Sequence, residues 1–280
     1  MTEFRRYIVV DWSAARPPNT GRNSIWIAVA DDPDRCADLR NPASQPEAVD
    51  LLQRLPGEGS APLLVGFDFC FGLVAGLGHL IDPESTPPWR AVWRFCASML
   101  ADDLSNKWEL GAHLNGLVHD GPGPFWGARL GDGRKSPFPV AGFVEWRRCE
   151  KAARAMGLRP KATWQLSGAG AVGLQSLTGI ARLETLRSGD ERVRVWPFEE
   201  STGAEVVMTE VYPSMFGPCP EHPVLDAAQV CGTARALASA DRSGELATWW
   251  DCPADDVVRG DEGWILGLPA TGDPGQTVGF

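Results

Sequence analysis

The chain has 280 residues, of which 44% are hydrophobic and 22% charged, a balance that excludes a wholly disordered protein. It contains 26 Lys and Arg residues and 36 Asp and Glu residues, which gives a net charge of −10. Because duplex nucleic acids are bound mainly through Lys and Arg, this charge argues against a general, tight nucleic-acid binder.

Cysteine usage and the start of the chain predict a protein of the reducing cytoplasm. There are seven cysteines, an odd number, with no CxxC pair, and the first six residues lead directly into a short apolar run rather than a signal peptide. No apolar run approaches the roughly 20 residues of a membrane span. With four histidines and no paired spacing, a zinc site of the usual kind is not expected.

The first part of the chain predicts three strands and a helix. Residues 7–10 and 23–30 are apolar runs joined by a turn-rich loop, which indicates an antiparallel hairpin. A short third strand is expected within residues 31–41. Ser44 and Glu47 have the spacing of a capping box and begin a helix that ends near Leu55. Residues 62–69 are nearly all apolar, as in a central strand covered on both faces.

The remainder predicts a helical region followed by two more strands and a long helix. Helices are expected at 89–104, 144–156 and 171–187, strands at 192–198 and 206–212, and a helix at 223–240. These elements predict one α/β domain over residues 1–270, with a helical insertion at about 71–189. Residues 271–280 are rich in glycine and predict a loose tail.

Four carboxylates stand where a shared site is expected. Asp11 and Asp68 end the first and the central strand, Glu210 lies in the last strand, and Asp226 begins the helix after it. Residues at the carboxyl ends of neighbouring parallel strands face a common crevice. Clustered carboxylates repel one another unless cations such as Mg²⁺ or Mn²⁺ neutralise them, as in two-metal phosphodiester cleavage. The alternative is that each Asp is an ordinary turn or cap residue.

Several segments strengthen the first interpretation because they resemble a family of predicted nucleases with a ribonuclease H-like fold. They are VDWSA at 10–14, GFDFCFGL at 66–73, WQLSGAGAVGLQSLTGI at 164–180, EVYPS at 210–214, DAAQVCGTARAL at 226–237 and EGWILG at 262–267. The family is similar to the Holliday-junction resolvase and YqgF branch of that superfamily. The resemblance implies a mixed five-stranded sheet of order 3-2-1-4-5, with strand 2 antiparallel and the helical insertion between strands 4 and 5.

The same resemblance implies roles for the acids. Asp11, Asp68 and Asp226 match the metal ligands, and Glu210 matches a further catalytic acid in support. The sequence departs from the pattern at Asp68, where many relatives of that branch have Glu.

Five further residues are candidates for substrate binding: Ser13, Gly168, Gly170, Lys161 and Arg134. The two glycines begin a G-x-G-x-x-G string in the middle of the chain, which is the wrong place for a dinucleotide fingerprint. The string suits a helix N-terminus that holds a phosphate, or alternatively a close packing of that helix. Arg134 and Lys161, together with Trp126 and Trp164, could form a basic surface on which nucleic-acid bases stack. Alternatively, these charged residues are solvated loop residues.

The sequence thus predicts a divalent-metal-dependent phosphodiester hydrolase with a small or single-stranded nucleic acid or a nucleotide as substrate. The alternative is a catalytically silent binding or regulatory module that retains the same fold. An ATP-handling relative of the actin and sugar-kinase branch fits poorly, since it needs a duplicated domain and two phosphate loops.

Overall fold

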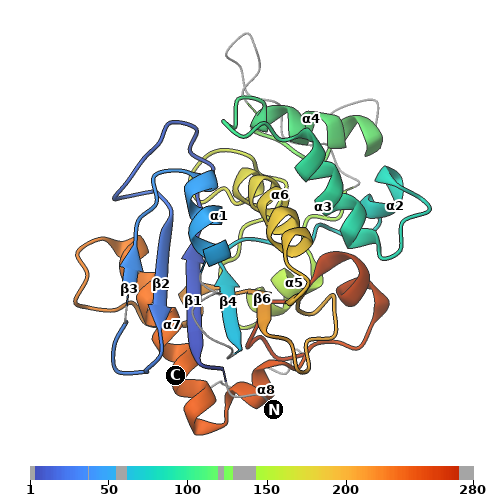
Figure 1. The fold of residues 1–280 in the computed structure, drawn as a ribbon. Helices are drawn as coiled ribbons and strands as arrows, with labels where there is room; N and C mark the ends of the chain where they lie inside the picture. The colour runs from blue at the N-terminus through green and yellow to red at the C-terminus, as the bar shows by residue number, and fades with distance from the viewer. Residues whose placement is uncertain (1–3, 37, 55–61, 119–122, 129–142, 271–280) are drawn as a thin grey trace. The chain divides into compact units, whose positions relative to one another are not determined.

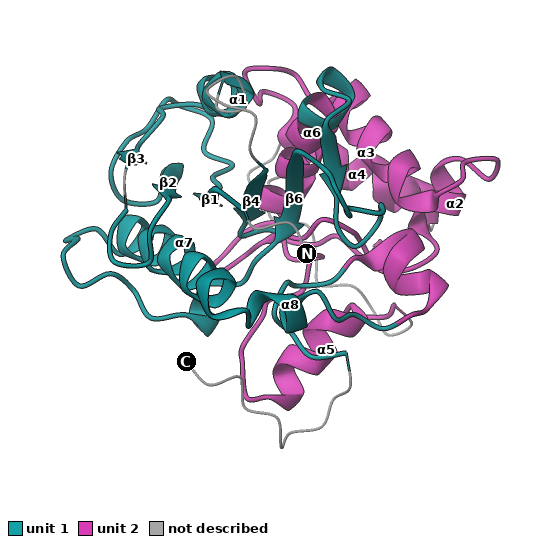
Figure 2. Ribbon diagram, turned by 60° about the horizontal axis from the view of Figure 1, so that its bottom comes forward, with its two compact units in different colours: residues 1–69, 186–253, 264–280 teal, residues 70–185, 254–263 magenta. Residues whose placement is uncertain are grey.

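The computed structural model describes residues 4–36, 38–54, 62–118, 123–128 and 143–270. The chain divides into two compact units, which Figure 2 shows in different colours. Unit 1 comprises Met1–Phe69, Leu186–Pro253 and Trp264–Phe280, and unit 2 comprises Cys70–Thr185 and Ala254–Gly263. The expected single domain over residues 1–270 stays a prediction, and the expected tail at 271–280 lies outside the described residues.

Unit 1 is built on a six-stranded mixed sheet of order β3-β2-β1-β4-β6-β5 (Figure 1). The strands are β1 (Arg6–Asp11), β2 (Trp26–Ala30), β3 (Asp38–Arg40), β4 (Leu63–Phe67), β5 (Val193–Val195) and β6 (Val206–Glu210). β2 is antiparallel to both of its neighbours, whereas β1, β4, β6 and β5 run parallel to one another. The predicted α/β class and the antiparallel second strand are therefore confirmed.

The expected five-strand order is corrected at the far side of the sheet. β6, not β5, pairs with β4, and β5 is an additional strand of three residues at the sheet edge. Every residue of β4 and of β6 is buried. An apolar strand of this kind gains most when it is covered on both faces, so β6 occupies the interior position and the shorter β5 the edge.

Two helices cover the sheet of unit 1 from opposite faces, α1 (Gln45–Arg54) from one and α7 (Leu225–Ser243) from the other (Figures 1 and 2). α7 packs on β1 and β2. At the start of α1 the Glu47 N–H donates to Ser44 Oγ over 3.4 Å. The Glu47 carboxylate accepts from the N–H of Ala43, at 2.8 Å, so the predicted capping interaction is displaced by one residue. A 3₁₀ turn (Pro213–Met215) and the short helix α8 (Leu246–Trp249) complete this unit's regular elements.

Unit 2 is helical. Its elements are α2 (Leu77–Ile81), α3 (Pro88–Met99), α4 (Lys107–Val118), α5 (Arg148–Ala155), most of α6 (Gly173–Gly189) and a π-helical turn (Val258–Glu262). The three helices expected here are confirmed with shifted or shorter bounds, whereas α2 and α4 were not expected. α4 contains two glycines and an asparagine, which lower helix propensity. No helix in the described ranges has the length and apolar character to cross a bilayer.

A buried ion pair organises the core of unit 2. Arg147 and Glu150 are each 1% exposed, and Arg147 Nε lies 2.9 Å from Glu150 Oε1. Arg147 also donates to the backbone carbonyl of Glu262, at 2.9 Å, and the Arg148 N–H donates to the Glu262 carboxylate, at 2.6 Å. Burial of both charges is tolerated because each is paired and hydrogen-bonded.

Candidate functional site: a carboxylate cluster on the sheet of unit 1

Asp11 and Asp68 come together because β1 and β4 are parallel neighbours. Val10 pairs with Phe67, so the next residue of each strand is an aspartate at the same edge. The Asp68 N–H donates to the carbonyl oxygen of Val10, at 3.2 Å, which continues the ladder by one step. Side chains alternate along strands, and so Asp11 and Asp68 share one face of the sheet.

Asp226 joins this pair from the first turn of α7, the helix that packs on β1 and β2. Its Oδ2 accepts a hydrogen bond from the backbone N–H of Asn23, at 2.7 Å. Asn23 has a φ of 56°, a left-handed conformation that Asn tolerates better than most residues. The loop before β2 therefore holds the Asp226 carboxylate in place.

The electrostatics of Asp11 show that the three acids interact. Burial, the charge of Asp68, a side-chain hydrogen bond with Asp68 and the charge of Asp226 together raise the pKa of Asp11 from 3.8 to about 10. Asp11 and Asp226 form no ion pair with any residue of the described ranges. The cluster thus concentrates negative charge that a cation can neutralise.

The raised pKa of Asp11 predicts a pH-dependent stability. A carboxyl whose pKa is higher in the folded than in the unfolded state takes up a proton on folding, so the free energy of unfolding falls as pH rises from 3.8 towards 10. Without divalent metal, Asp11→Asn should therefore be more stable than the wild type. The difference should grow by up to about 1.4 kcal/mol per pH unit.

Urea unfolding in a chelator at several values between about pH 5 and pH 8 measures this effect. Asp50→Asn, at an exposed position on α1, is the matched control and should show no such trend. The prediction is contradicted if the difference in stability between Asp11→Asn and the wild type does not change with pH.

Glu210 lies on the other face of the sheet. It is the last residue of β6 and pairs with Phe67, the residue before Asp68. Because paired residues of parallel strands point to the same side, Glu210 shares the face of Phe67 and not that of Asp68. It is 4% exposed and does not contribute to the pKa of Asp11. A supporting catalytic role for Glu210 stays a prediction that this placement does not favour.

The residues after Asp11 form a loop that supports the cluster. The Trp12 N–H donates to Asp68 Oδ1, at 2.8 Å. The Ser13 hydroxyl donates to the carbonyl of Asn23, at 3.3 Å, and accepts from the N–H of Ala15, at 3.2 Å. Ser13 thus connects the strand that carries Asp11 to the residue that holds Asp226. Substrate binding by Ser13 stays a prediction.

The glycine string is found in unit 2. Gly168 and Gly170 have positive φ angles of 110° and 70° and are exposed, and the exposed Lys161 places its stem over Gly170. At Gly173 a Cβ would lie 2.2 Å from the carbonyl oxygen of Thr163, which confirms the interpretation of close packing there. Phosphate binding by Gly168, Gly170 and Lys161 stays a prediction, and Arg134 lies outside the described residues.

Sequence reasoning missed the backbone donors of Trp12 and Asn23, and it missed Trp26. Trp26 pairs with Asp11 across the strands, and its ring meets that of His222 edge-on, with centroids 6.2 Å apart. The Nδ1 of His222 is buried and has no hydrogen-bond partner in the described structure. The sequence predicted a strand from residue 23, whereas β2 begins at Trp26 and Asn23 lies in the preceding loop, where it contacts Asp226 of α7.

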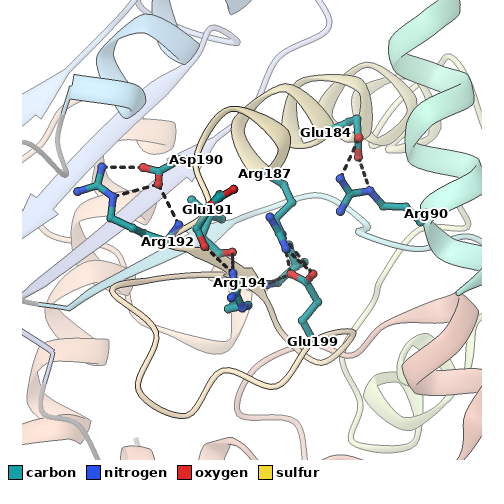
Figure 3. A network of polar contacts seen from close by, with 10 residues as sticks. Arg90, Glu184, Arg187, Asp190, Glu191, Arg192, Arg194 and Glu199 are labelled. Carbon is teal, nitrogen blue, oxygen red and sulfur yellow. Dashed lines mark hydrogen bonds and ion pairs between the residues drawn. The ribbon is translucent and has the colours of Figure 1, made fainter.

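A cavity of about 360 Å³ opens on the opposite face of the sheet, beside α1. Apolar strand residues such as Ile8, Val65 and Met208 line it together with Asp190 and Arg192. Figure 3 shows that these two charged residues bind each other, with Arg192 Nη2 2.7 Å from Asp190 Oδ2. Its lining is mixed, with apolar strand residues and polar groups, and the guanidinium of Arg192 is already paired with Asp190. The cavity lies on the face of the sheet away from Asp11 and Asp68.

The acidic cluster has the donor chemistry of a magnesium or manganese site, because both ions prefer carboxylate oxygens. In the described part of the chain, no group of three or more His, Cys, Asp or Glu residues is arranged to hold a metal ion by itself. A bound ion would thus need other oxygen atoms besides these carboxylates.

Comparisons with models of protein families, with curated proteins and with solved structures found no match.

Proposed function

We propose that this chain is a divalent-metal-dependent phosphodiester hydrolase with a ribonuclease H-like fold. The observation that carries the proposal is the convergence of Asp11, Asp68 and Asp226 on one face of the sheet, where burial, and after it the two neighbouring acids, raise the pKa of Asp11 to about 10. Asp11 and Asp226 have no ion pair within the described ranges, and carboxylates without a cationic partner are suited to bind a metal ion.

The arrangement of unit 1 supports the ribonuclease H-like assignment. The order 3-2-1-4 with an antiparallel second strand agrees with the pattern that the sequence resemblance implies. β6 takes the position beside β4 that the pattern gives to its fifth strand, and α7 brings the last acid to the same face as the first two.

In the proposed site Asp11 and Asp68 hold the cation, and Asp226 contributes from α7. Mg²⁺ is commonly bound through one or two carboxylates, with water and substrate phosphate oxygens as the other ligands. An ion held by two carboxylates and by substrate oxygens does not need three protein ligands. Such a site is therefore compatible with the lack of a preformed three-residue group among the described residues. When bound, such an ion polarises the phosphoryl group and lowers the pKa of an attacking water.

The chain's own residues position and neutralise the site. The N–H groups of Trp12 and Asn23 orient the carboxylates of Asp68 and Asp226, so that neither side chain needs to reorganise. Because burial and its acidic neighbours raise the pKa of Asp11 to about 10, a cation that binds this carboxylate would have to displace a proton. The net charge of −10 favours a nucleotide or a short single strand over a long duplex as the substrate.

Calorimetric titration of the full chain with Mn²⁺ and Mg²⁺ tests the metal site. We expect micromolar to millimolar binding that Asp68→Ala removes, accompanied by proton release because Asp11 ionises. Asp50→Ala, which removes an exposed carboxylate from α1, is the control and should bind like the wild type. The titration is repeated with a non-hydrolysable dinucleotide, which supplies phosphate oxygens. If the protein binds neither metal, with or without the dinucleotide, the proposal is contradicted.

The second candidate is a silent binding or regulatory module. The lack of a preformed three-residue metal group among the described residues is the observation in its favour. This module would bind metal or nucleotide in the same titration, yet it would not hydrolyse bis(p-nitrophenyl) phosphate or short oligonucleotides with either ion.

A further inference from the structure

Three of the seven cysteines gather in unit 1, at one side of α7. Cys231 lies on this helix, Cys219 in the segment before it, and Cys36 near β3. The Sγ atoms of Cys219 and Cys231 are 2.8 Å apart, and the Cys36 thiol lies 3.5 Å from the carbonyl oxygen of Cys231. Cys219 and Cys231 are 5% and 4% exposed, whereas Cys36 is partly exposed.

Backbone packing brings Cys219 to Cys231. The Cys219 N–H donates to the carbonyl of Ala228 on α7, at 2.8 Å. At Gly232, the residue after Cys231, a Cβ would lie only 2.0 Å from the carbonyl oxygen of Gly217. The glycine therefore lets the segment that contains Gly217 and Cys219 lie directly against the helix.

Polar groups surround this pair. The guanidinium of Arg235, one turn after Cys231, lies 3.0 Å from the Sγ of Cys219 and 3.6 Å from the Glu221 carboxylate. Burial raises the pKa of Cys219 to about 12 and that of Cys231 to about 11, although Arg235 opposes both shifts. Burial therefore favours the protonated thiol form of both groups.

The distance between the two sulfur atoms distinguishes two uses of such a pair. Two thiolates that share a tetrahedral zinc ion stand about 3.7 Å apart, because each Zn–S bond is about 2.3 Å long. The pair here is closer than that, and the described residues contain no metal-holding group that includes it. The two sulfur atoms are in direct contact and the side chains point at each other, as formation of a disulfide requires.

We propose that Cys219 and Cys231 are a reversible oxidation site that forms a disulfide with a peroxide as the oxidant. The two S–H bonds and the O–O bond of hydrogen peroxide break, one S–S bond forms, and two water molecules leave. Two electrons pass from the sulfur atoms to the peroxide oxygens, and a dithiol reductant reverses the change.

The disulfide would close a ring of chain that contains Asp226, because this residue lies between the two cysteines. The ring would tie the segment before α7 to the helix and restrict the residues around Asp226. Since the site is defined by the thiols alone, it does not depend on hydrolase activity.

The first test is peptide mapping of the full-length wild-type protein. Reduced protein is freed of reductant, treated with hydrogen peroxide, alkylated under denaturing conditions, digested and analysed by mass spectrometry. We expect the Cys219 and Cys231 peptides to be recovered as one linked species that has lost two hydrogen atoms and is separated again by dithiothreitol. Cys96, which is fully buried and away from other thiols in the described structure, should be recovered alkylated.

The second test is the thermal unfolding midpoint, which should rise by roughly 5–10 °C on oxidation of the wild type. Cys219→Ser should lose the shift, whereas Cys252→Ser, which alters a buried cysteine outside the cluster, should keep it. The proposal is overturned if Cys219 and Cys231 remain free while other thiols oxidise. A link from Cys231 to Cys36 in place of Cys219 overturns it as well.

Discussion

Asp11→Asn is expected to reduce metal-dependent phosphodiester hydrolysis by about a thousandfold or more. The substitution keeps the size of the side chain but removes the negative charge that a bound cation would need. Asp11 interacts with both other acids of the cluster, since burial, Asp68 and Asp226 raise its pKa to about 10. Initial rates with bis(p-nitrophenyl) phosphate and with short oligonucleotides, in the presence of Mn²⁺ or Mg²⁺, measure the effect.

Folding and catalysis can be separated in this experiment because the variant should be at least as stable as the wild type in a chelator. Asp50→Asn is the control for the loss of one negative charge and should retain full activity. If Asp11→Asn turns over substrate at the wild-type rate, the assignment of the acidic cluster as the catalytic site is wrong.

Arg147→Ala is expected to lower the free energy of unfolding by about 3–5 kcal/mol. The substitution leaves the Glu150 carboxylate buried without its cation and removes the donor to the carbonyl of Glu262. Both effects lower the free energy of unfolding strongly because Arg147 and Glu150 lie in the core of unit 2 and are each 1% exposed. Urea unfolding followed by circular dichroism and by tryptophan fluorescence measures the loss.

Arg192→Ala is the matched control, because it also removes an arginine from an ion pair. Arg192 is 45% exposed and pairs with Asp190, so its loss should lower the free energy of unfolding far less than the loss of Arg147. The double variant Arg147→Met with Glu150→Leu should recover part of the stability, since no charge then remains buried there. Equal losses for the two single variants contradict the role assigned to burial.

Much of unit 1 could be predicted from local patterns. The apolar runs before Asp11 and Asp68 form β1 and β4, and the long helix after residue 223 forms α7. These features follow from side-chain periodicity and turn residues, which neighbouring positions encode. The order of β5 and β6 was harder to predict, because both are short apolar runs and only burial in the sheet decides which takes the interior position.

The candidate site shows the same division. The positions of Asp11 and Asp68 at strand ends indicated a shared edge, and parallel pairing of β1 with β4 confirms that they are neighbours. The expected support from Glu210 depended on strand register. Pairing with Phe67 places Glu210 on the other face, because a shift of one residue reverses every side chain of a strand.

The sequence by itself determined the α/β class, the apolar core strands and the acids that end two of them. Tertiary structure decided which distant groups meet. Asn23 holds Asp226 from 203 residues away, and Arg147 reaches Glu262 across 115 residues. Local propensity carries no information on such contacts, because they form only when strand register and helix packing bring the segments together.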